Sequence, residues 1–182
     1  MPIEALVLLG LITLNGVFAM SEIALVTARR ARLQVLVEEG DRGAAAAMAL
    51  NTEPTRFLST IQVGITSIGI TSGIVGEAAF AYPLSQWLIG LGVKPGNASL
   101  GATVLVVVVI TYVSIVIGEL VPKRLGQIWP EAIARRVATP IRWLATATRP
   151  FVRLLSSSTD LLLRLFGTRG TRETSVTEEE IH

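Results

Sequence analysis

Three long stretches with almost no charge are the feature that most constrains how this chain folds. They are Ile3–Ala28, which contains Glu4, Ser21 and Glu22, then Phe57–Gly76 and Asn97–Gly118. Each is about the 20 residues that an α-helix needs to cross the hydrocarbon core of a bilayer. Only 16% of the 182 residues are charged, whereas a soluble domain carries about a quarter. The sequence therefore predicts an all-α membrane protein with three transmembrane helices.

Ala78–Val93 is a fourth apolar stretch, but it is short for a span and contains Pro83. Tyr82 and Trp87 are residue types that favour the membrane interface. We therefore expect a short outer helical hairpin or a re-entrant segment here rather than a fourth span.

Two further regions have the apolar periodicity of amphipathic helices. Arg29–Leu50 is predicted to form one such helix after the first span. Trp129–Phe166 is predicted to form a juxtamembrane helical belt in the inner headgroup region, bent or interrupted at Pro140 and Pro150. Its arginines recur on one helical face, which suits contact with anionic headgroups.

The basic residues predict the topology. Five arginines lie between the first two spans and only Lys94 lies between the second and third. Lys123, Arg124 and eight more arginines follow the third span. By the positive-inside rule, the N-terminus is outside the plasma membrane and the C-terminus is cytoplasmic. The basic residues are thus explained by topology and give no indication of a nucleic-acid partner.

Residues for enzyme chemistry are scarce. The chain has no cysteine, which excludes disulfides and thiolate metal sites, and its one histidine is His182 at the end of the sequence. There is no HExxH motif, no pair of aspartates and no serine–histidine arrangement. The sequence therefore does not predict an enzyme.

Glu119 is the strongest candidate for a functional residue. It directly follows Gly101–Gly118, a run of 18 residues without charge. An acid at the end of a lipid-length segment usually marks a path for ions or protons. Pro122 is expected to distort the helix and free carbonyl groups upstream of it. One fixed negative charge with spare backbone oxygens would suit a hard cation.

Helix rise indicates how polar residues of different spans could meet. At 1.5 Å per residue, Ser21 lies about 12 Å from Arg29, Ser67 about 16 Å from Arg56 and Glu119 about 6 Å from Lys123. The three could meet in the inner half of the bilayer if the second span were interrupted or tilted, which its glycines make plausible.

Two features of these spans leave alternatives open. Gly69 and Gly73 form a GxxxG pattern, which could serve a homodimer interface, packing within one subunit or an unwound ion site. Glu22 competes with Glu119 for the central role, unless it only forms an ion pair with Arg29 or Lys123.

Four blocks of sequence carry a resemblance to a known family. They are Asn15–Ala24 (NGVFAMSEIA), Arg29–Leu33 (RRARL), Pro54–Leu58 with Gln62–Thr66 (PTRFL and QVGIT) and Gly118–Lys123 (GELVPK). In order and spacing they resemble the transmembrane domain of the CorC/cyclin M (CNNM) family of magnesium transporters, over nearly all of the chain.

The resemblance implies three spans with a helical belt, a homodimer, and export of Mg²⁺ coupled to Na⁺ entry. Carried over by position, the family's ion site implies Ser21, Ser67 and Glu119, together with the carbonyl of Gly118. Asn15 and Ser72 are weaker candidates, so the expected metal site comprises Asn15, Ser21, Ser67, Ser72, Gly118 and Glu119. The residues alone would not choose Mg²⁺ over Na⁺ or Ca²⁺.

The resemblance also implies the domain organisation. Residues 1–166 would form the ion-transport domain with its belt, and residues 167–182 a polar linker. Ser175–Ile181 (SVTEEEI) looks like the family's junction to a cytosolic pair of CBS domains, and Thr177 and Glu180 form a capping-box pattern there. The alternative to a transporter is a membrane anchor or regulator that senses Mg²⁺ without moving it.

Overall fold

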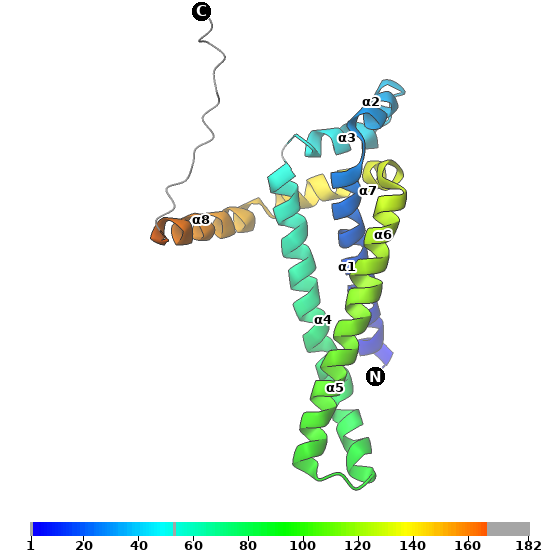
Figure 1. The fold of residues 1–182 in the computed structure, drawn as a ribbon, viewed down its shortest axis with the longest axis vertical. Helices are drawn as coiled ribbons and strands as arrows, with labels where there is room; N and C mark the ends of the chain where they lie inside the picture. Colours follow the sequence, from blue (N-terminus) through cyan, green and yellow to red (C-terminus); the bar gives the residue numbers. More distant parts are fainter. Residues whose placement is uncertain (1, 53, 167–182) are drawn as a thin grey trace, which may run out of the picture. The chain divides into compact units, whose positions relative to one another are not determined.

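The computed structural model describes residues 2–52 and 54–166, and these residues form helices and turns without any strand (Figure 1). This confirms the predicted all-α class. The elements in chain order are α1 (Pro2–Thr27), α2 (Arg30–Glu38), α3 (Arg42–Leu50), α4 (Pro54–Gly90), α5 (Pro95–Ile115), the π-helix η1 (Val116–Leu120), α6 (Val121–Ile128), α7 (Pro130–Ala147) and α8 (Arg149–Leu165).

The chain divides into two units, Met1–Thr146 and Ala147–His182. The first contains α1 to α7, apart from the last residue of α7, and α8 is the described part of the second. The predicted linker, 167–182, with its capping-box pattern, lies outside the described residues.

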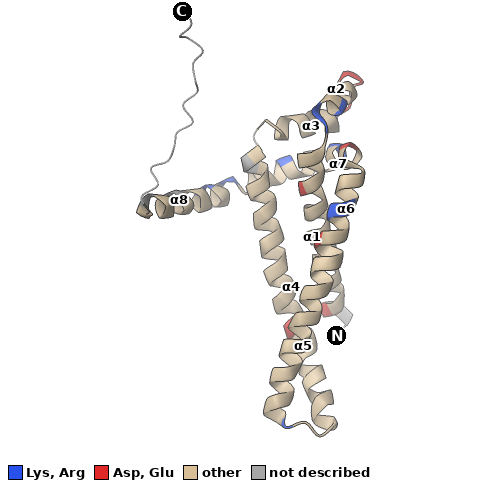
Figure 2. Cartoon of the chain, in the orientation of Figure 1, with Lys and Arg blue, Asp and Glu red and all other residues tan. Residues whose placement is uncertain are grey.

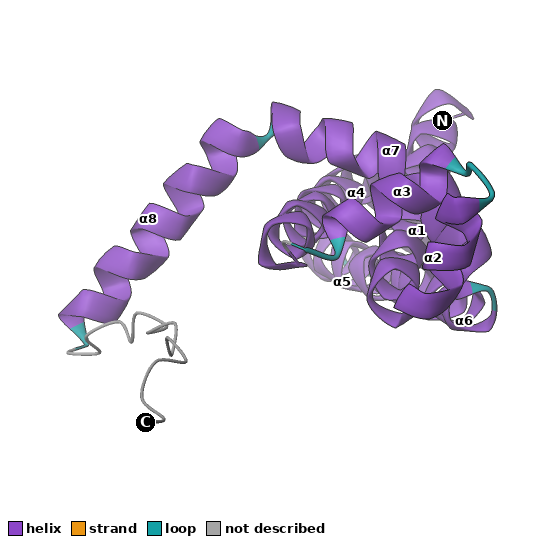
Figure 3. Cartoon of the chain, turned by 90° about the horizontal axis from the view of Figure 1, so that it is seen from above, coloured by secondary structure: helices purple, strands orange, loops and turns teal. Residues whose placement is uncertain are grey.

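Three helical stretches of the described chain are long and apolar enough to cross a membrane, as predicted. They are Ile3–Thr27, Phe57–Gly90 and Pro95–Ile128. The third combines α5, η1 and α6 into one continuous rod. In the first unit, α1 lies against both α4 and the η1–α6 end of this rod, and α4 pairs with α5 (Figures 1 and 3).

The second span is longer and more regular than the sequence indicated. Ala78–Gly90 is not a separate or re-entrant segment, because it continues α4, and Pro83 lies inside the helix. α4 has 37 residues, or about 55 Å at the standard rise, against about 30 Å of hydrocarbon. A turn with Gly92 at φ +91° then leads into α5, so the two helix ends form a hairpin. The glycines of α4 do not interrupt it.

The single amphipathic helix predicted over Arg29–Leu50 is wrong, because two helices form there. Gly40 adopts φ +89°, a left-handed conformation that favours glycine and ends α2. Asp41 then caps α3, since its Oδ1 accepts a hydrogen bond from the backbone N–H of Ala44 at 2.9 Å. The polar residues between the two apolar runs were the signal for this break.

The main core of the first unit lies where α2, α3 and α7 cover one end of the membrane helices. Its buried members come from α1 to α4 and α7: Leu25, Ala28, Leu33, Ala44, Ala46, Ala47, Leu50, Phe57, Ile61, Ala134, Ala138 and Ile141. Most basic residues of the first unit lie on the ribbon at this end (Figure 2). Lys94 belongs to the turn between α4 and α5. α7 therefore packs against protein, beyond the interfacial role predicted for the belt.

The rest of the predicted belt is α8, in the second unit. The helix is interrupted at Thr148, between α7 and α8. Pro150 lies in the first turn of α8, where its missing N–H group would have had no partner within the helix. Pro140, by contrast, is accommodated inside α7. On α8, the side chains of Phe151, Leu154, Leu161 and Leu165 are exposed, as suits a helix at an apolar interface.

An ion pair joins α3 to α7. Arg135 Nη1 lies 3.0 Å from Asp41 Oδ2. The backbones are close, because a Cβ atom on Gly43 would collide with the carbonyl of Arg135. The hydrogen bond from Ala44, and then the guanidinium of Arg135, hold the pKa of Asp41 below its ordinary value.

A second close contact joins α1 to α6. A Cβ atom on Gly126 would lie 2.8 Å from the carbonyl oxygen of Met20 and would collide with the side chain of Ile23. Only glycine allows this approach of two membrane helices.

The Asp41 pKa predicts a dependence of stability on pH. Because the folded pKa is lowered, the carboxylate stabilises the fold fully above its unfolded pKa of about 3.9. That contribution is lost as the pH falls through the folded pKa. Asp41→Asn keeps a good cap but removes the charge, so it should lower the thermal midpoint at pH 7, and the difference from wild type should vanish at the acidic end. Glu39→Gln, an exposed neighbour, is the control; a pH-independent difference for Asp41→Asn would contradict the assignment.

The Gly126 contact predicts the effect of one added methyl group. Gly126→Ala should destabilise the fold by about 1–3 kcal/mol through overpacking. Gly10→Ala is the matched control on α1, because no atom lies within 4 Å of its added Cβ. It should be neutral or stabilising, since alanine is the better helix former. Thermal unfolding in detergent measures both variants, and equal midpoints would show that the helices do not meet at Gly126.

Candidate ion-binding site

The helix distortion expected before Pro122 is present as η1, a π-helical segment at Val116–Leu120. Proline has no N–H group to bond to the preceding turn, and its ring crowds that turn. The regular ladder of hydrogen bonds is therefore disturbed at Gly118 and Glu119. Single-turn π-helices of this kind occur frequently at functional sites.

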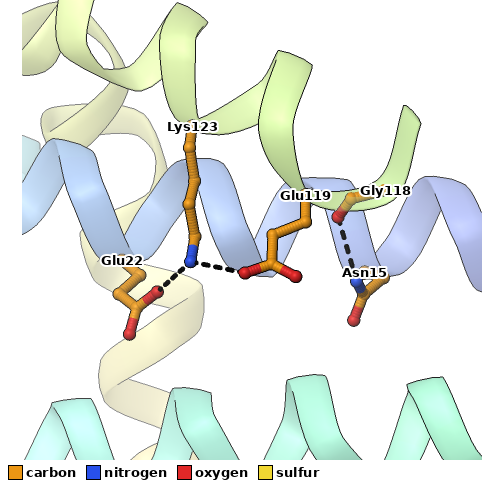
Figure 4. A network of polar contacts seen from close by, with 5 residues as sticks. All are labelled: Asn15, Glu22, Gly118, Glu119 and Lys123. Atoms are coloured by element: carbon orange, nitrogen blue, oxygen red, sulfur yellow. Dashed lines mark hydrogen bonds and ion pairs between the residues drawn. The ribbon is translucent and has the colours of Figure 1, made fainter. Parts of the chain in front are cut away.

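Glycines bring α1 against this distorted turn. A Cβ atom on Gly16 would lie 3.0 Å from Pro122 Cγ, and one on Gly118 would lie 3.2 Å from the carbonyl oxygen of Ile12. The close approach lets Asn15 Nδ2 donate a hydrogen bond to the Gly118 carbonyl at 2.9 Å (Figure 4). Thus one predicted site residue of α1 directly contacts another on η1.

Glu119 is not the lone charge that the sequence suggested. Lys123, one turn later, places its Nζ 2.8 Å from Glu119 Oε1 and 3.4 Å from Glu22 Oε2 on α1 (Figure 4). Glu22 thus forms the ion pair considered as its alternative role, but with an ammonium that also holds Glu119. The side chains of Glu119, Lys123 and Glu22 are 37%, 31% and 20% exposed. Two carboxylates and one ammonium leave a net charge of −1.

Within the described part of the chain, two buried oxygen atoms near this turn have no hydrogen-bond partner. They are Asn15 Oδ1 and Ser114 Oγ. Asn15 is only 8% exposed, so its carbonyl oxygen is removed from solvent and accepts no hydrogen bond within the described chain. Such a group is uncommon in a native structure and calls for an explanation, of which a bound ligand is one.

The serine hydroxyls of the predicted site that form hydrogen bonds do so with carbonyls of their own helices. Ser21 is fully buried on α1 and donates to the carbonyl of Val17 at 2.6 Å. Ser72 is buried on α4 and donates to Ile68 at 2.8 Å. Each hydroxyl oxygen keeps acceptor capacity while donating. Ser67 is exposed on α4, and its carbonyl accepts a bond from Thr71.

The structure therefore brings together Asn15, Gly118 and Glu119, whereas the Ser72 hydroxyl donates within its own helix and Ser67 is exposed. No group of three or more His, Cys, Asp or Glu side chains suited to a metal exists among the described residues. A hard cation at this site would be held by a small number of carboxylates with amide, hydroxyl and carbonyl oxygens, and by water.

Sequence reasoning missed one acid of the membrane helices, Glu77. Glu77 lies on α4 and accepts a hydrogen bond of 3.3 Å from Thr103 Oγ1 on α5. It directly follows the uncharged run Phe57–Gly76, so it looked like the end of a span. Since α4 continues to Gly90, Glu77 lies within the apolar helix instead.

Comparison with known proteins agrees with this architecture. Residues 6–182 match the family model described as the cyclin M transmembrane N-terminal domain (CNNM). The UPF0053 protein sll0260 of Synechocystis sp. is 45% identical over 179 residues, which cover 98% of this chain and 40% of that protein. UPF0053 protein YhdT of Bacillus subtilis is 34% identical over 182 residues, covering 98% of this chain and 40% of its own length.

A relative with a functional name is the polyamine export protein of Escherichia coli K12, which is 30% identical over 177 residues, covering 97% of this chain and 39% of that protein. The chain thus spans about 40% of the length of these relatives, which is consistent with further domains in them. The described residues form three membrane-length helices with a π-helical turn before Pro122, and the family match covers nearly the whole sequence. The chain belongs to the CNNM family as a transmembrane N-terminal domain.

Proposed function

We propose that this chain is the membrane-embedded part of a cation exporter, with Mg²⁺ as its substrate and Na⁺ entry as its driving force. One observation carries the proposal: acidic and neutral oxygens converge where α1 meets the π-helical turn. Glu119 and Glu22 supply charge, and the buried Asn15 Oδ1 accepts no hydrogen bond from the residues that the structure describes. An ionisable cluster of this kind within membrane helices is a functional site by default.

The chemistry of these oxygens suits a small hard ion. Mg²⁺ prefers six oxygen ligands, dehydrates reluctantly and is usually held by one or two carboxylates together with water. Glu119 with Asn15 and the Gly118 carbonyl would supply the first contacts. Ser21, on the same helix as Asn15, would join through the acceptor capacity of its hydroxyl. Ser67 and Ser72 would join only after a movement of α4 against α1, which alternating access would provide. Na⁺ would use oxygens of the same type.

Polyamine export is a second candidate, favoured by a specific contact. Lys123 already places a primary ammonium between two carboxylates, so the site fits the charged group of an alkyl amine. Relatives at 30% and 31% identity are named polyamine export proteins. A polyamine and Mg²⁺ would compete for the same acids.

The rival to transport is a membrane regulator that binds Mg²⁺ for cytosolic domains without moving it. Only the relatives' greater length points to such domains, which would include the expected CBS pair. The distribution of basic residues supports the orientation for either role, with the N-terminus outside the plasma membrane and the C-terminus in the cytoplasm.

We further propose a homodimer that forms through α4. Gly69 and Gly73 of the GxxxG pattern have no atom within 4 Å of an added Cβ. This face of α4 is therefore not used for packing within the described chain, and α4 is not unwound there. Of the three roles left open by the sequence, contact with a second copy is the one that remains, and Ile70 and Ile74 are exposed beside it.

Flux measurements in liposomes test the transport proposal. The wild-type chain should move Mg²⁺ out of loaded vesicles when an inward Na⁺ gradient is applied, and Glu119→Gln should reduce this flux to background, because it removes a carboxylate from the site. Glu39→Gln, an exposed acid in the turn after α2, should transport normally. Labelled spermidine in parallel vesicles separates the two substrates. Binding of Mg²⁺ without flux of either cation would establish the regulator instead.

Crosslinking in membranes tests the dimer. Replacing Gly69 and Gly73 together by leucine should reduce the crosslinked dimer by about tenfold, since close helix approach requires small residues. Gly10→Leu is the control, because its site on α1 is also exposed and open. If both variants dimerised like wild type, the α4 face would not be the interface.

A further inference from the structure

The ammonium of Lys123 lies between the two acids that the proposed transport function assigns to the substrate. Its ammonium contacts both acids of the cluster, at 2.8 Å and 3.4 Å, and it bridges two separate elements, α6 and α1. The place between Glu22 and Glu119 is thus already occupied by a cation. That cation is covalently attached to the protein.

We propose that Lys123 is an internal competing cation, which occupies the position of the transported ion and leaves it when that ion binds. The proposal rests on the proposed function and deepens it, because it makes Glu22 the second acid of the substrate site and makes Lys123 the residue that sets affinity. Substrates would be small cations able to satisfy two carboxylates, either a divalent metal ion or a primary ammonium.

The charges account for the exchange. With Lys123 in place, the cluster carries −1, and with Lys123 displaced it carries −2, which a divalent ion neutralises. Two carboxylates left alone at membrane depth would be costly, so the lysine stabilises the empty site. A substrate ion must therefore replace an existing ion pair rather than fill a vacant site, and this lowers its affinity and favours its later release.

The side chain of Lys123 can make this movement. It is 31% exposed, so solvent is available to its ammonium outside the cluster. Its four-carbon stem is flexible and its three donors have no fixed orientation. Arg124, the next residue, is exposed and forms no ion pair within the described part of the chain. It therefore provides a matched control of equal charge on the same helix.

If Lys123 competes with the substrate ion, removing its charge should raise the affinity for Mg²⁺, whereas removing a purely structural ion pair should lower it. Lys123→Gln should bind Mg²⁺ about tenfold more tightly than wild type, because a positive charge a few ångströms from the ion is gone. Arg124→Gln should bind within about twofold of wild type, since the screened surface charge contributes little. If Lys123 only held α6 to α1, Lys123→Gln would bind more weakly.

A chemical modification test compares two side-chain charges at position 123 in the same protein variant. The chain contains no cysteine, so Lys123→Cys introduces a unique thiol. Aminoethyl methanethiosulfonate restores a positive charge there, and methyl methanethiosulfonate leaves a neutral side chain of shorter length. Calorimetry with MgCl₂ and with spermidine, on the same preparation in lipid nanodiscs, should give about tenfold tighter binding for the neutral adduct than for the charged one.

Equal affinities of the two adducts, or weaker binding by the neutral one, would overturn the proposal. So would a neutral adduct that binds neither cation. These results are independent of flux: if wild type bound cations but moved none, the transport proposal would fail, while tighter binding by the neutral adduct would still establish the competition. Flux with equal affinities would leave transport standing and remove the role of Lys123.

Discussion

The close contact between α1 and the η1–α6 end of the third span is the constraint on which the candidate site depends. Gly16, Gly118 and Gly126 remove side chains from this interface, so the backbones approach closely enough for one helix to reach the polar groups of the other. Without an apolar driving force between helices in lipid, such packing is a main source of association. The hydrogen bond from Asn15 and the contact from Glu22 both follow from it.

The stability of the acidic side chains within the membrane helices depends on how far their charges are paired. A carboxylate at membrane depth is costly unless it is paired. Here one ammonium serves two acids, so the cluster is only partly neutralised, and the π-helical turn beside it supplies further polar groups. This incomplete compensation separates the cluster from the Asp41–Arg135 pair, in which one acid meets one base. It is also why we propose the cluster, and not that pair, as the cation site.

The family match and the geometry constrain function at different levels. The match identifies a CNNM transmembrane domain but does not identify the ion. The geometry offers few acids and several neutral oxygens, which suits an ion that is bound briefly and then released.

The sequence alone determined the helical class, the three spans and the helix distortion before Pro122. These follow from lengths of uncharged sequence and from the chemistry of proline, which are local properties. It did not reveal that α4 runs unbroken past Glu77, because Pro83 and the glycines argued for a break that packing against α5 prevents. It also merged α2 and α3, whose separation depends on the backbone of Gly40 and the cap of Asp41.

Only the tertiary structure decided which polar residues share a site. Asn15 and Gly118 are 103 positions apart, and Glu22 and Lys123 lie on different helices. Helix rise could estimate their depth but not the direction in which each side chain points. Rotation of a helix about its axis is set by packing against its neighbours, so the glycine contacts turned Glu22 and Lys123 toward each other while leaving Ser67 exposed.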